Sequence, residues 1–396
     1  TNTNVIRNGS ARDANVSALN LSLFNKANTY QFLFNGAYSH VTGADAHNGF
    51  SSGISYGKVS GKWQWGIANN MVSPNYDPND LGFLRSPNIF STKLSGAYTQ
   101  FNPGKLFNFR NYSISFEQTN LLKPFAAQEF KVEADFLHVF KNFWDVTFLV
   151  SSQPFWATDY FELRRGTGYP FKRMPYTFLG LTGSSDSRKK LYIKSFLGYA
   201  NFSPIKNDPF TLIRLGARYR FSPKFSMEFS EERQDDVGTY GVALKNGIPV
   251  VINDTSIAGR RQVIQFTNLL TATYNFKARM TLTMRARHYW SRVNYVQVFK
   301  VLPDGSWHEP RFFMDGLDQN YNLFNLDMFF TWDFRLGSRL VVAWKNALGP
   351  DAEVDGTRYD KYAGNFSQIF SIPHSNELTV KFIYYIDYLQ LRKKKN

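Results

Sequence analysis

The sequence predicts an all-β protein in which the strands form one large antiparallel transmembrane β-barrel. Three observations carry this prediction. Aromatic residues make up 17% of the 396 residues, yet the mean hydropathy is only −0.36. Apolar and polar residues alternate along many segments, as they do on strands that have one apolar face. No apolar run reaches about 18 residues, the length that a membrane-spanning helix needs.

The C-terminal segment Glu377–Asn396 shows this alternation clearly and ends on a basic tail. One side of an extended strand would carry Leu378, Val380, Phe382, Tyr384, Ile386 and Tyr388. The other side would carry Glu377, Thr379, Lys381 and Asp387. About thirteen residues is long for a globular strand but suits a tilted strand that crosses a bilayer.

The same period of two recurs in residues 30–39, 130–136, 264–274, 281–290 and 324–335. In each segment nearly all of the charge falls on one face. A Lys or Arg that faced lipid at mid-membrane would cost about 2–4 kcal/mol. The segregation therefore predicts that the apolar face contacts lipid and the polar face lines a lumen.

Short and long connections are expected to take turns along the chain. The tight links are Lys26–Asn28, Lys141–Asn142, Ser222–Lys224, Lys277–Arg279 and Gly337–Ser338. The long ones are Ser73–Asn88, Ser152–Pro175, Glu231–Arg260, Lys300–Gln319 and Asn346–Asn376. Bacterial outer-membrane barrels show this asymmetry, with short periplasmic turns and longer outer loops.

Counting along the alternation predicts about seventeen strands in a single domain over residues 1–396. If the last strand runs inward, parity makes the first strand, Ala18–Phe24, run inward too, so that residues 1–15 begin outside. We therefore expect an odd number of strands ahead of Thr1, which makes this chain the later part of a larger barrel. The pattern is least regular at Tyr176–Leu181 and at a loop hairpin around Ala243–Val251.

Charged residues of both signs fall on the predicted lumen face. The candidate lumen-lining residues are Lys131, Glu133, Asp135, Arg214, Arg218, Arg285, Arg287, Asp327, Asp333 and Arg335. Arg285 and Arg287 lie on the strand expected to neighbour the one that bears Asp327 and Asp333. Such a lining suits either a water-filled lumen or cross-strand ion pairs around a plug. A selective pore would more often show one dominant sign at a constriction.

The loop Gln153–Tyr176 interleaves aromatic and basic residues. Its candidate binding residues are Phe155, Trp156, Tyr160, Arg164, Arg165 and Tyr169. Aromatic rings stack on sugars or anchor a partner protein, and arginines grip phosphate or carboxylate. The alternative is a loop that folds over the barrel mouth and packs on itself, or an aromatic belt at the membrane edge.

No residue set predicts catalysis, a metal site or a cofactor. Cysteine is absent, which excludes disulfides and thiolate chemistry. His40 and His47 are poorly spaced for a metal, and His288, beside Trp290, is expected in an interfacial belt. Asp77, Asn79 and Asp80 are better explained as turn residues than as cation ligands. No spacing of serines singles out a nucleophile.

The net charge of +15 is spread along strands and loops, apart from the terminal RKKKN. Nucleic acid is therefore not an expected partner. The expected partners are outer-membrane lipid and lipopolysaccharide. Other outer-membrane or periplasmic proteins and glycan are further candidates.

Three stretches together resemble one protein family: SPNYDPNDLGF (Ser73–Phe83), ARHYWSRVNY (Ala286–Tyr295) and LTVKFIYYIDYLQL (Leu378–Leu391). The family comprises Bacteroidota-type envelope proteins with a signal peptide and a carbohydrate-binding family-nine-like domain. These precede a C-terminal domain of unknown function thought to form an outer-membrane barrel. The resemblance covers the whole chain as the later part of that domain. It implies no activity, substrate or catalytic residue.

We therefore expect a non-enzymatic β-barrel of a bacterial outer membrane. It would act as a pore or scaffold whose outer loops bind glycan or a partner in a transport or secretion assembly. One alternative is a membrane-embedded hydrolase that acts on lipid or glycan. Another is a soluble all-β protein such as a propeller, which would turn the apolar face inward. The sequence identifies neither the bound molecule nor an open or plugged lumen.

Overall fold

The computed structural model describes residues 2–5, 12–43, 45–79, 83–84, 86–164, 166–202, 208–245, 247–312, 314–348 and 361–388. Strand accounts for 71% of the structure, and one short helix, α1 (Tyr362–Gln368), is found among these residues. The predicted all-β fold is confirmed. No helix in this part of the chain is long and apolar enough to cross a bilayer.

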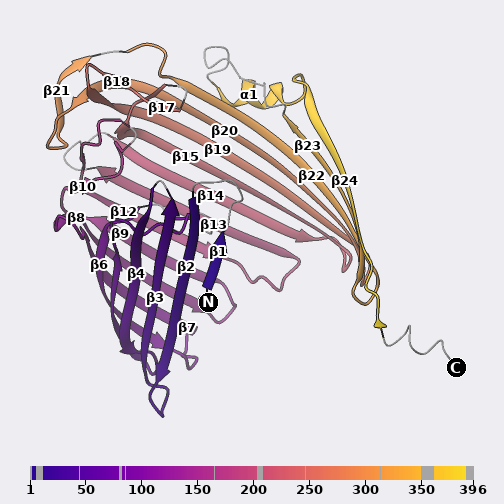
Figure 1. Ribbon diagram of the computed structural model, residues 1–396. Helices are drawn as coiled ribbons and strands as arrows, with labels where there is room; N and C mark the ends of the chain where they lie inside the picture. The colour runs from indigo at the N-terminus through magenta and orange to yellow at the C-terminus, as the bar shows by residue number, and fades with distance from the viewer. Residues whose placement is uncertain are drawn as a thin grey trace.

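The main strands follow one another in an up-and-down meander, each paired antiparallel with the next (Figure 1). Short connections suffice because antiparallel neighbours can be joined by a tight turn. The main strands are β1 (Asn2–Val5), β2 (Arg12–Phe24), β3 (Tyr30–Gly43), β4 (His47–Lys58), β5 (Trp63–Val72), β6 (Ile89–Gln100), β7 (Phe107–Leu121), β8 (Ala126–Phe140), β9 (Asp145–Gln153), β12 (Tyr176–Ser184), β13 (Leu191–Phe202), β14 (Pro209–Arg220), β15 (Phe225–Val242), β19 (Thr255–Lys277), β20 (Met280–Val301), β22 (Gln319–Arg335), β23 (Ser338–Leu348) and β24 (His374–Ile383). The short strands in the connections are β10 (Ala157–Asp159), β11 (Phe171–Arg173), β16 (Leu244–Lys245), β17 (Ile248–Pro249), β18 (Val251–Ile252) and β21 (Trp307–Phe312).

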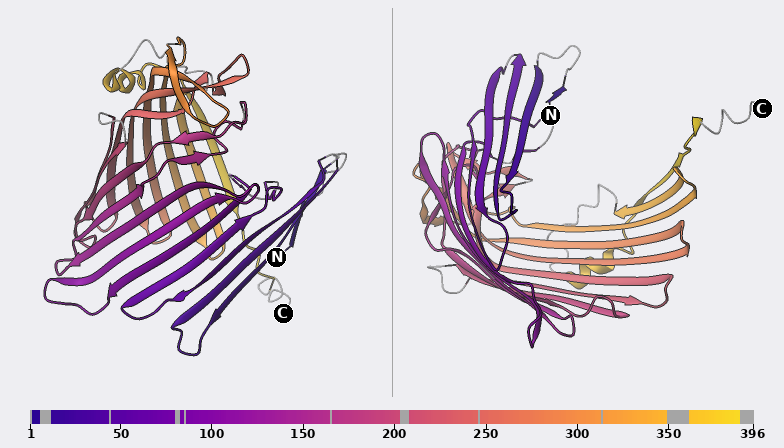
Figure 2. Two further views of the ribbon diagram at one scale, coloured as in Figure 1. Left: turned by 90° about the vertical axis from the view of Figure 1, so that its left-hand side faces the viewer. Right: turned by 90° about the horizontal axis from the view of Figure 1, so that it is seen from below.

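Within the described ranges the sheet contains 20 strands and forms an open arc (Figure 2). Among the described residues β1 pairs only with β2 at one edge, and β24 pairs only with β23 at the other. The right-hand view shows these two edges well apart. Because a barrel closes only when its edge strands share hydrogen bonds, no closed barrel is found within this part of the chain. The sequence predicts the later part of a larger barrel, and the structure shows its large antiparallel sheet.

The register carries the alternation from strand to strand. Ile67 on β5 lies opposite Leu94 on β6, which lies opposite Phe116 on β7. These three side chains are 45%, 50% and 40% exposed. Soluble monomers rarely expose a continuous apolar surface larger than a few hundred Å². The apolar face of this sheet is therefore a broad exposed surface, and the face behind it is polar.

The polar face lies on the concave side of the arc. Glu117 on β7 and Lys131 on β8 line the same cavity as Val242, which ends β15. β8 and β15 are separated in the sheet by β9, β12, β13 and β14. Side chains from such distant strands can converge only on the inside of a curved sheet.

Short turns join the strands at one end, here the short-turn end, and all long connections leave from the other, here the long-connection end (Figure 1). Three expectations need correction. The predicted connection Glu231–Arg260 is shorter, because β15 and β19 stay paired through a bulge between Asp236 and Thr239. The irregular stretch Tyr176–Leu181 belongs to a main strand, β12. β1 precedes β2, so the parity count from Ala18–Phe24 starts one strand too late.

The helix α1 packs on the apolar face near the long-connection end. Tyr362 stacks on Phe266 with ring centroids 4.5 Å apart, and its hydroxyl accepts a hydrogen bond of 2.7 Å from Asn268. Beneath the helix His288 is 3% exposed and lies 2.8 Å from the side-chain oxygen of Asn322. The sequence places His288 among lipid-facing residues, but α1 covers it, and a period of two cannot reveal a helix packed from elsewhere in the chain.

Candidate functional site

A cavity of about 1000 Å³ lies against the polar face at the long-connection end. Its floor comes from β5 to β9, and its cover comes mainly from residues 154–175, here called the roof. The roof contains the hairpin β10–β11, whose strands pair Ala157 with Arg173 and Asp159 with Phe171. The segment after β15, including Leu244 and Pro249, closes the far side.

Arg173 holds the roof in shape. Its Nη2 atom lies 2.8 Å from Asp159 Oδ2 and 2.9 Å from Glu162 Oε2. The other oxygen of Asp159 accepts hydrogen bonds from the amides of Phe161 at 2.8 Å and Glu162 at 3.0 Å. One guanidinium therefore fixes two carboxylates and the turn between them.

The same contacts set the protonation of Asp159. Burial by itself would raise the pKa of Asp159, but the hydrogen bond from the Phe161 amide and the charge of Arg173 outweigh it. The pKa of Asp159 is consequently held below its ordinary value. The roof therefore carries a carboxylate, not a carboxylic acid, at neutral pH.

The roof is tied to strands on the other side of the arc. The Val242 amide donates to Glu162 Oε1 at 3.1 Å, and the Thr167 amide donates to Ser256 Oγ at 3.1 Å. Trp307 Nε1 donates to the Lys172 carbonyl at 2.6 Å. These bonds join β15, β19 and β21 to a loop that springs from β9. The roof thus bridges the inside of the arc.

An apolar cluster supports these bonds from above the main sheet. It unites roof residues with the ends of β15, β19 and β20. Its buried members are Leu163, Phe171, Met174, Val242, Ala258, Phe299, Val301 and Trp307. Each large side chain buried there is worth about 1.5–3 kcal/mol relative to exposure, so the roof is a packed structure.

The polar face of β6 to β8 carries alternating charges, here called the charge lattice: Lys93, Glu117, Glu129, Lys131 and Glu133. Of these, Glu117, Glu129 and Lys131 line the cavity. Lys131 Nζ lies 2.9 Å from Glu129 Oε1, and Lys93 Nζ lies 3.5 Å from Glu133 Oε2. Glu117 lies opposite Lys93 on one side and Lys131 on the other. Neighbouring strands therefore present opposite charges to each other, which stabilises cross-strand pairing.

The predicted loop residues divide between packing and exposure. Arg164 lines the cavity and donates to the Phe161 carbonyl at 3.2 Å, and Tyr169 packs on the apolar cluster. Phe155 and Trp156 are 64% and 48% exposed at the start of the roof, and Tyr160 is half-buried. Arg165 lies outside the described residues. The geometry thus combines the two interpretations of this loop: it packs on itself, yet keeps two aromatic rings open.

The predicted lumen residues of β8 and β14 share the polar face. Glu133 pairs with Lys93, and the Ser113 hydroxyl donates to Asp135 at 3.3 Å. On β14 Arg214 forms an ion pair with Glu232, and Arg218 donates to the Ser187 carbonyl at 2.5 Å. Lys131 is the one member of the predicted lumen set that lines the roofed cavity.

The remaining predicted residues lie away from the cavity. Arg285 lies opposite Asp327, as expected for neighbouring strands, and Arg287 lies opposite Asn325. Asp333 does not contact these arginines. It forms an ion pair with Arg339 on β23, at 2.5 Å. Arg335 is near the same turn and donates to the Tyr384 hydroxyl at 3.0 Å. Asp333 and Arg335 therefore belong to the short-turn end.

The sequence prediction missed four acidic residues of the site: Glu117, Glu129, Asp159 and Glu162. Glu129 could have been predicted from the sequence, because residues 129, 131 and 133 share one face of a strand. Asp159 and Glu162 lie in the loop that was interpreted through its arginines. Their partner Arg173 could not be assigned without the fold of the roof.

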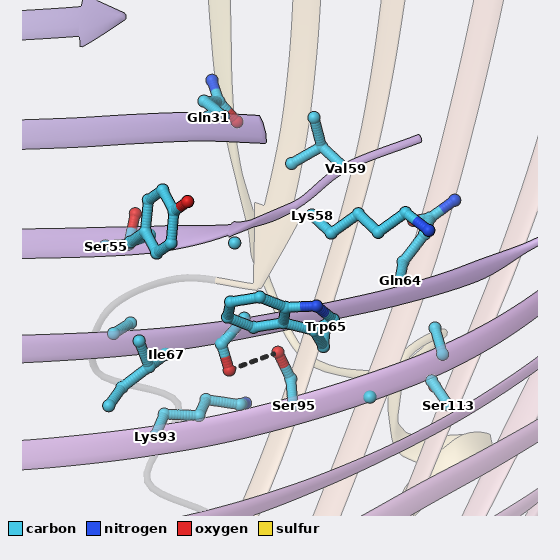
Figure 3. Close-up of a pocket in the computed structure, with 16 residues that line it drawn as sticks. Gln31, Ser55, Lys58, Val59, Gln64, Trp65, Ile67, Lys93, Ser95 and Ser113 are labelled. Atoms are coloured by element: carbon cyan, nitrogen blue, oxygen red, sulfur yellow. Dashed lines mark hydrogen bonds between the residues drawn. The ribbon is translucent and has the colours of Figure 1, made fainter. Parts of the chain in front are cut away.

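A second pocket, of about 340 Å³, lies over β3 to β7 (Figure 3). Its lining combines small and polar residues, among them Ser55, Lys93 and Ser113, with the larger apolar side chains of Trp65 and Ile67. Ser95 points its hydroxyl toward the Gly66 carbonyl, 3.4 Å away.

Asp77 and Asn79 lie in the connection that follows β5, where the Asp77 side chain accepts a hydrogen bond from the Asn79 amide at 3.0 Å. This bond is the one expected of turn residues. Asp80 lies outside the described residues.

The fold thus defines an all-β protein with one large antiparallel sheet and a roofed cavity on its polar face. The chain belongs to the family described as a domain of unknown function, DUF5916, whose family model matches residues 1–395. This match confirms the part of the resemblance that concerns a domain of unknown function. It does not bear on the bacterial group, the outer membrane or a sugar-binding domain. No curated protein matches the chain.

Proposed function

We propose that this chain forms part of the wall of a non-enzymatic β-barrel in a bacterial outer membrane. Its apolar face would contact lipid and lipopolysaccharide, and its polar face would line a lumen for a pore or scaffold. The exposed aromatic residues of the roof would meet glycan or a partner protein of a transport or secretion assembly.

The observation that carries the proposal is the separation of the two faces over a long meander. Ile67, Leu94 and Phe116 form one row on the apolar face and remain about half exposed. Lys93 and Glu117, their neighbours in sequence, carry opposite charges on the other face. In water such a large exposed apolar surface is unfavourable, whereas in a bilayer the lipid chains cover it.

The lumen would be narrowed at one end. The roof crosses the concave side and is fixed there by Arg173, Glu162 and the apolar cluster. Because the long connections of outer-membrane barrels lie outside the cell, the roof would face the exterior. A molecule that passes or docks would therefore meet the roofed cavity first.

Single-cysteine labelling tests the assignment of the faces, since the chain has no cysteine of its own. Leu94→Cys and Ser95→Cys are matched variants, because they are adjacent on β6, point to opposite faces and are both exposed. In bacteria that express the full-length protein, we expect Leu94→Cys to react with a bilayer-confined probe and Ser95→Cys to react with an aqueous maleimide.

The opposite labelling pattern, or equal labelling of both variants by the aqueous reagent, would contradict a membrane-facing apolar surface. Planar-bilayer recordings of the purified protein then separate a pore from a scaffold. A pore gives discrete conductance steps, and a scaffold gives none while still retaining its partner.

A further inference from the structure

The polar face changes character on β12 to β14. Three phenylalanines lie there side by side: Phe178, Phe196 and Phe210, here called the aromatic strip. The ring centroids of Phe178 and Phe196 are 6.2 Å apart with planes 14° from parallel. Phe210 lies 6.2 Å from Phe178 on its other side. All three side chains are half-buried, so part of each ring stays open to the concave side.

Glycines beneath the rings bring them close to the sheet. A Cβ added at Gly198 would lie 2.7 Å from a ring carbon of Phe178 and 2.9 Å from one of Phe196. A Cβ at Gly180 would lie 3.2 Å from Phe178. Any larger residue would push the rings away. The missing side chains therefore let two nearly parallel rings lie over the backbone as an apolar platform.

Charged groups of both signs border this platform. The Arg214 guanidinium lies 5.2 Å from the centre of the Phe196 ring and pairs with Glu232. Lys194 Nζ lies 2.6 Å from Glu228 Oε1. These four side chains are between 35% and 51% exposed, so each can reach a ligand on the strip.

The strip continues from the roofed cavity. Tyr176 lines that cavity and lies two residues before Phe178, on the same face of β12. In the other direction Tyr192 precedes Phe196 on the same face of β13, with the Arg218 guanidinium 5.0 Å from its ring centre. Aromatic side chains thus run along the concave wall from the cavity toward the short-turn end.

We propose that the aromatic strip binds a saccharide chain and guides it along the concave wall. A sugar ring has an apolar C–H face, which fits an aromatic ring, and peripheral hydroxyls, which hydrogen-bond to guanidinium and carboxylate groups. The border groups Arg214, Glu232, Lys194 and Glu228 sum to no net charge, which suits a neutral ligand. The inference rests on the proposed function in one respect, that the concave wall is a solvent-filled lumen.

Isothermal titration calorimetry tests the proposal with the full-length protein in detergent and two neutral probes, maltohexaose and cellohexaose. We expect at least one of them to bind. Replacement of one ring by Phe178→Ala or Phe196→Ala should weaken binding about tenfold, as for other central aromatic contacts. Phe196→Leu should weaken it equally, because leucine stays apolar but lacks a flat face, and Phe196→Trp should retain it.

The matched control is Phe136→Ala on β8, which removes a 39% exposed ring from the apolar face. It should leave binding unchanged. Circular dichroism and heat-dependent gel mobility identify any variant that fails to fold. If Phe196→Ala fails to fold, the binding affinity of Phe196→Leu tests the proposal instead. The proposal is overturned if neither hexasaccharide binds the wild type, or if Phe196→Leu binds as tightly as the wild type.

Conductance separates this failure from failure of the proposed function. If the protein conducts ions but binds neither sugar, the pore is supported and the saccharide proposal is overturned. If it binds sugar through Phe196 but gives no current, the saccharide proposal is supported and the pore is overturned.

Discussion

Two regions of the same polar face carry different kinds of side chains on the concave side. On β6 to β8 the face carries the charge lattice, in which Lys93, Glu117 and Lys131 alternate in sign across neighbouring strands. On β12 to β14 the face carries phenylalanine rings that lie over glycines, with Arg214 and Glu232 at the border. The comparison teaches that alternation decides which side a residue faces, but not what that side can bind.

A second contrast lies between the exposed ion pairs of these regions and one buried pair next to β14. The ion pair of Lys93 with Glu133 is open to water, with side chains 38% and 49% exposed. Above the aromatic strip Asp208, which is 0% exposed, pairs with Arg260 of β19. The first pair is screened by solvent and the second is not, so their removal should have very different costs.

The largest effect is expected at the buried pair. Arg260→Ala leaves Asp208 buried without its cation, which should lower the free energy of unfolding by about 3 kcal/mol. Urea unfolding in detergent, followed by tryptophan fluorescence, measures this loss. The matched control is Arg233→Ala, whose partner Asp235 is 3.3 Å away and whose own side chain is 51% exposed. Equal stability of the two variants would show that burial of an ion pair does not set the cost of removing its cation.

A smaller effect is expected in the roof. Asp159→Asn keeps the shape but weakens the bonds to Arg173, a 39% exposed partner, so the loss should be about 1 kcal/mol. Hydrogen exchange of residues 154–175 measures it, because local opening precedes global unfolding. The charge-conserving variant Asp159→Glu separates loss of charge from loss of geometry.

Acid should reproduce this loss in the wild type. The folded pKa of Asp159 lies below its ordinary value of 3.8, so its stabilisation is fully present above pH 3.8. It disappears as the pH falls below 3.8 and through the lowered pKa. The protection factors of the roof amides, which correct for the intrinsic pH dependence of exchange, should therefore fall at acid pH in the wild type but not in Asp159→Asn. Identical pH profiles would show that Asp159 does not hold the roof.

The smallest effect is expected in the charge lattice. Lys93→Ala should change the free energy of unfolding by less than about 1 kcal/mol, because the Glu133 pair is exposed. The same urea experiment at low and high salt measures it, and Glu133→Gln is the matched partner variant. A loss as large as that of Arg260→Ala would mean that the lattice is a desolvated network.

The sequence predicted the strands where one face is apolar and the other polar. It was least decisive at Tyr176–Leu181, and the structure explains why. Phe178 points to the concave side while Leu179 and Leu181 point to the apolar face, so both faces are apolar and the period of two is obscured. The segment that looked irregular is the one that carries the aromatic strip.

The candidate site was predicted only in part, for a reason of distance along the chain. Lys131 and Arg164 were recognised from local patterns, and both line the cavity. The bond between Trp307 and Lys172 spans 135 positions of sequence. Nothing local to either residue specifies the other, because the contact depends on how far the arc curves.

The sequence by itself determined the all-β class, the two faces and the short turns between strands, because these follow from the alternating directions of neighbouring side chains. Tertiary structure alone decided that residues 154–175 cross the concave side, that α1 covers His288, and that three phenylalanines from three strands lie together. Each of these depends on strand register and sheet curvature, which are set by the summed packing of many distant residues and leave no local signal.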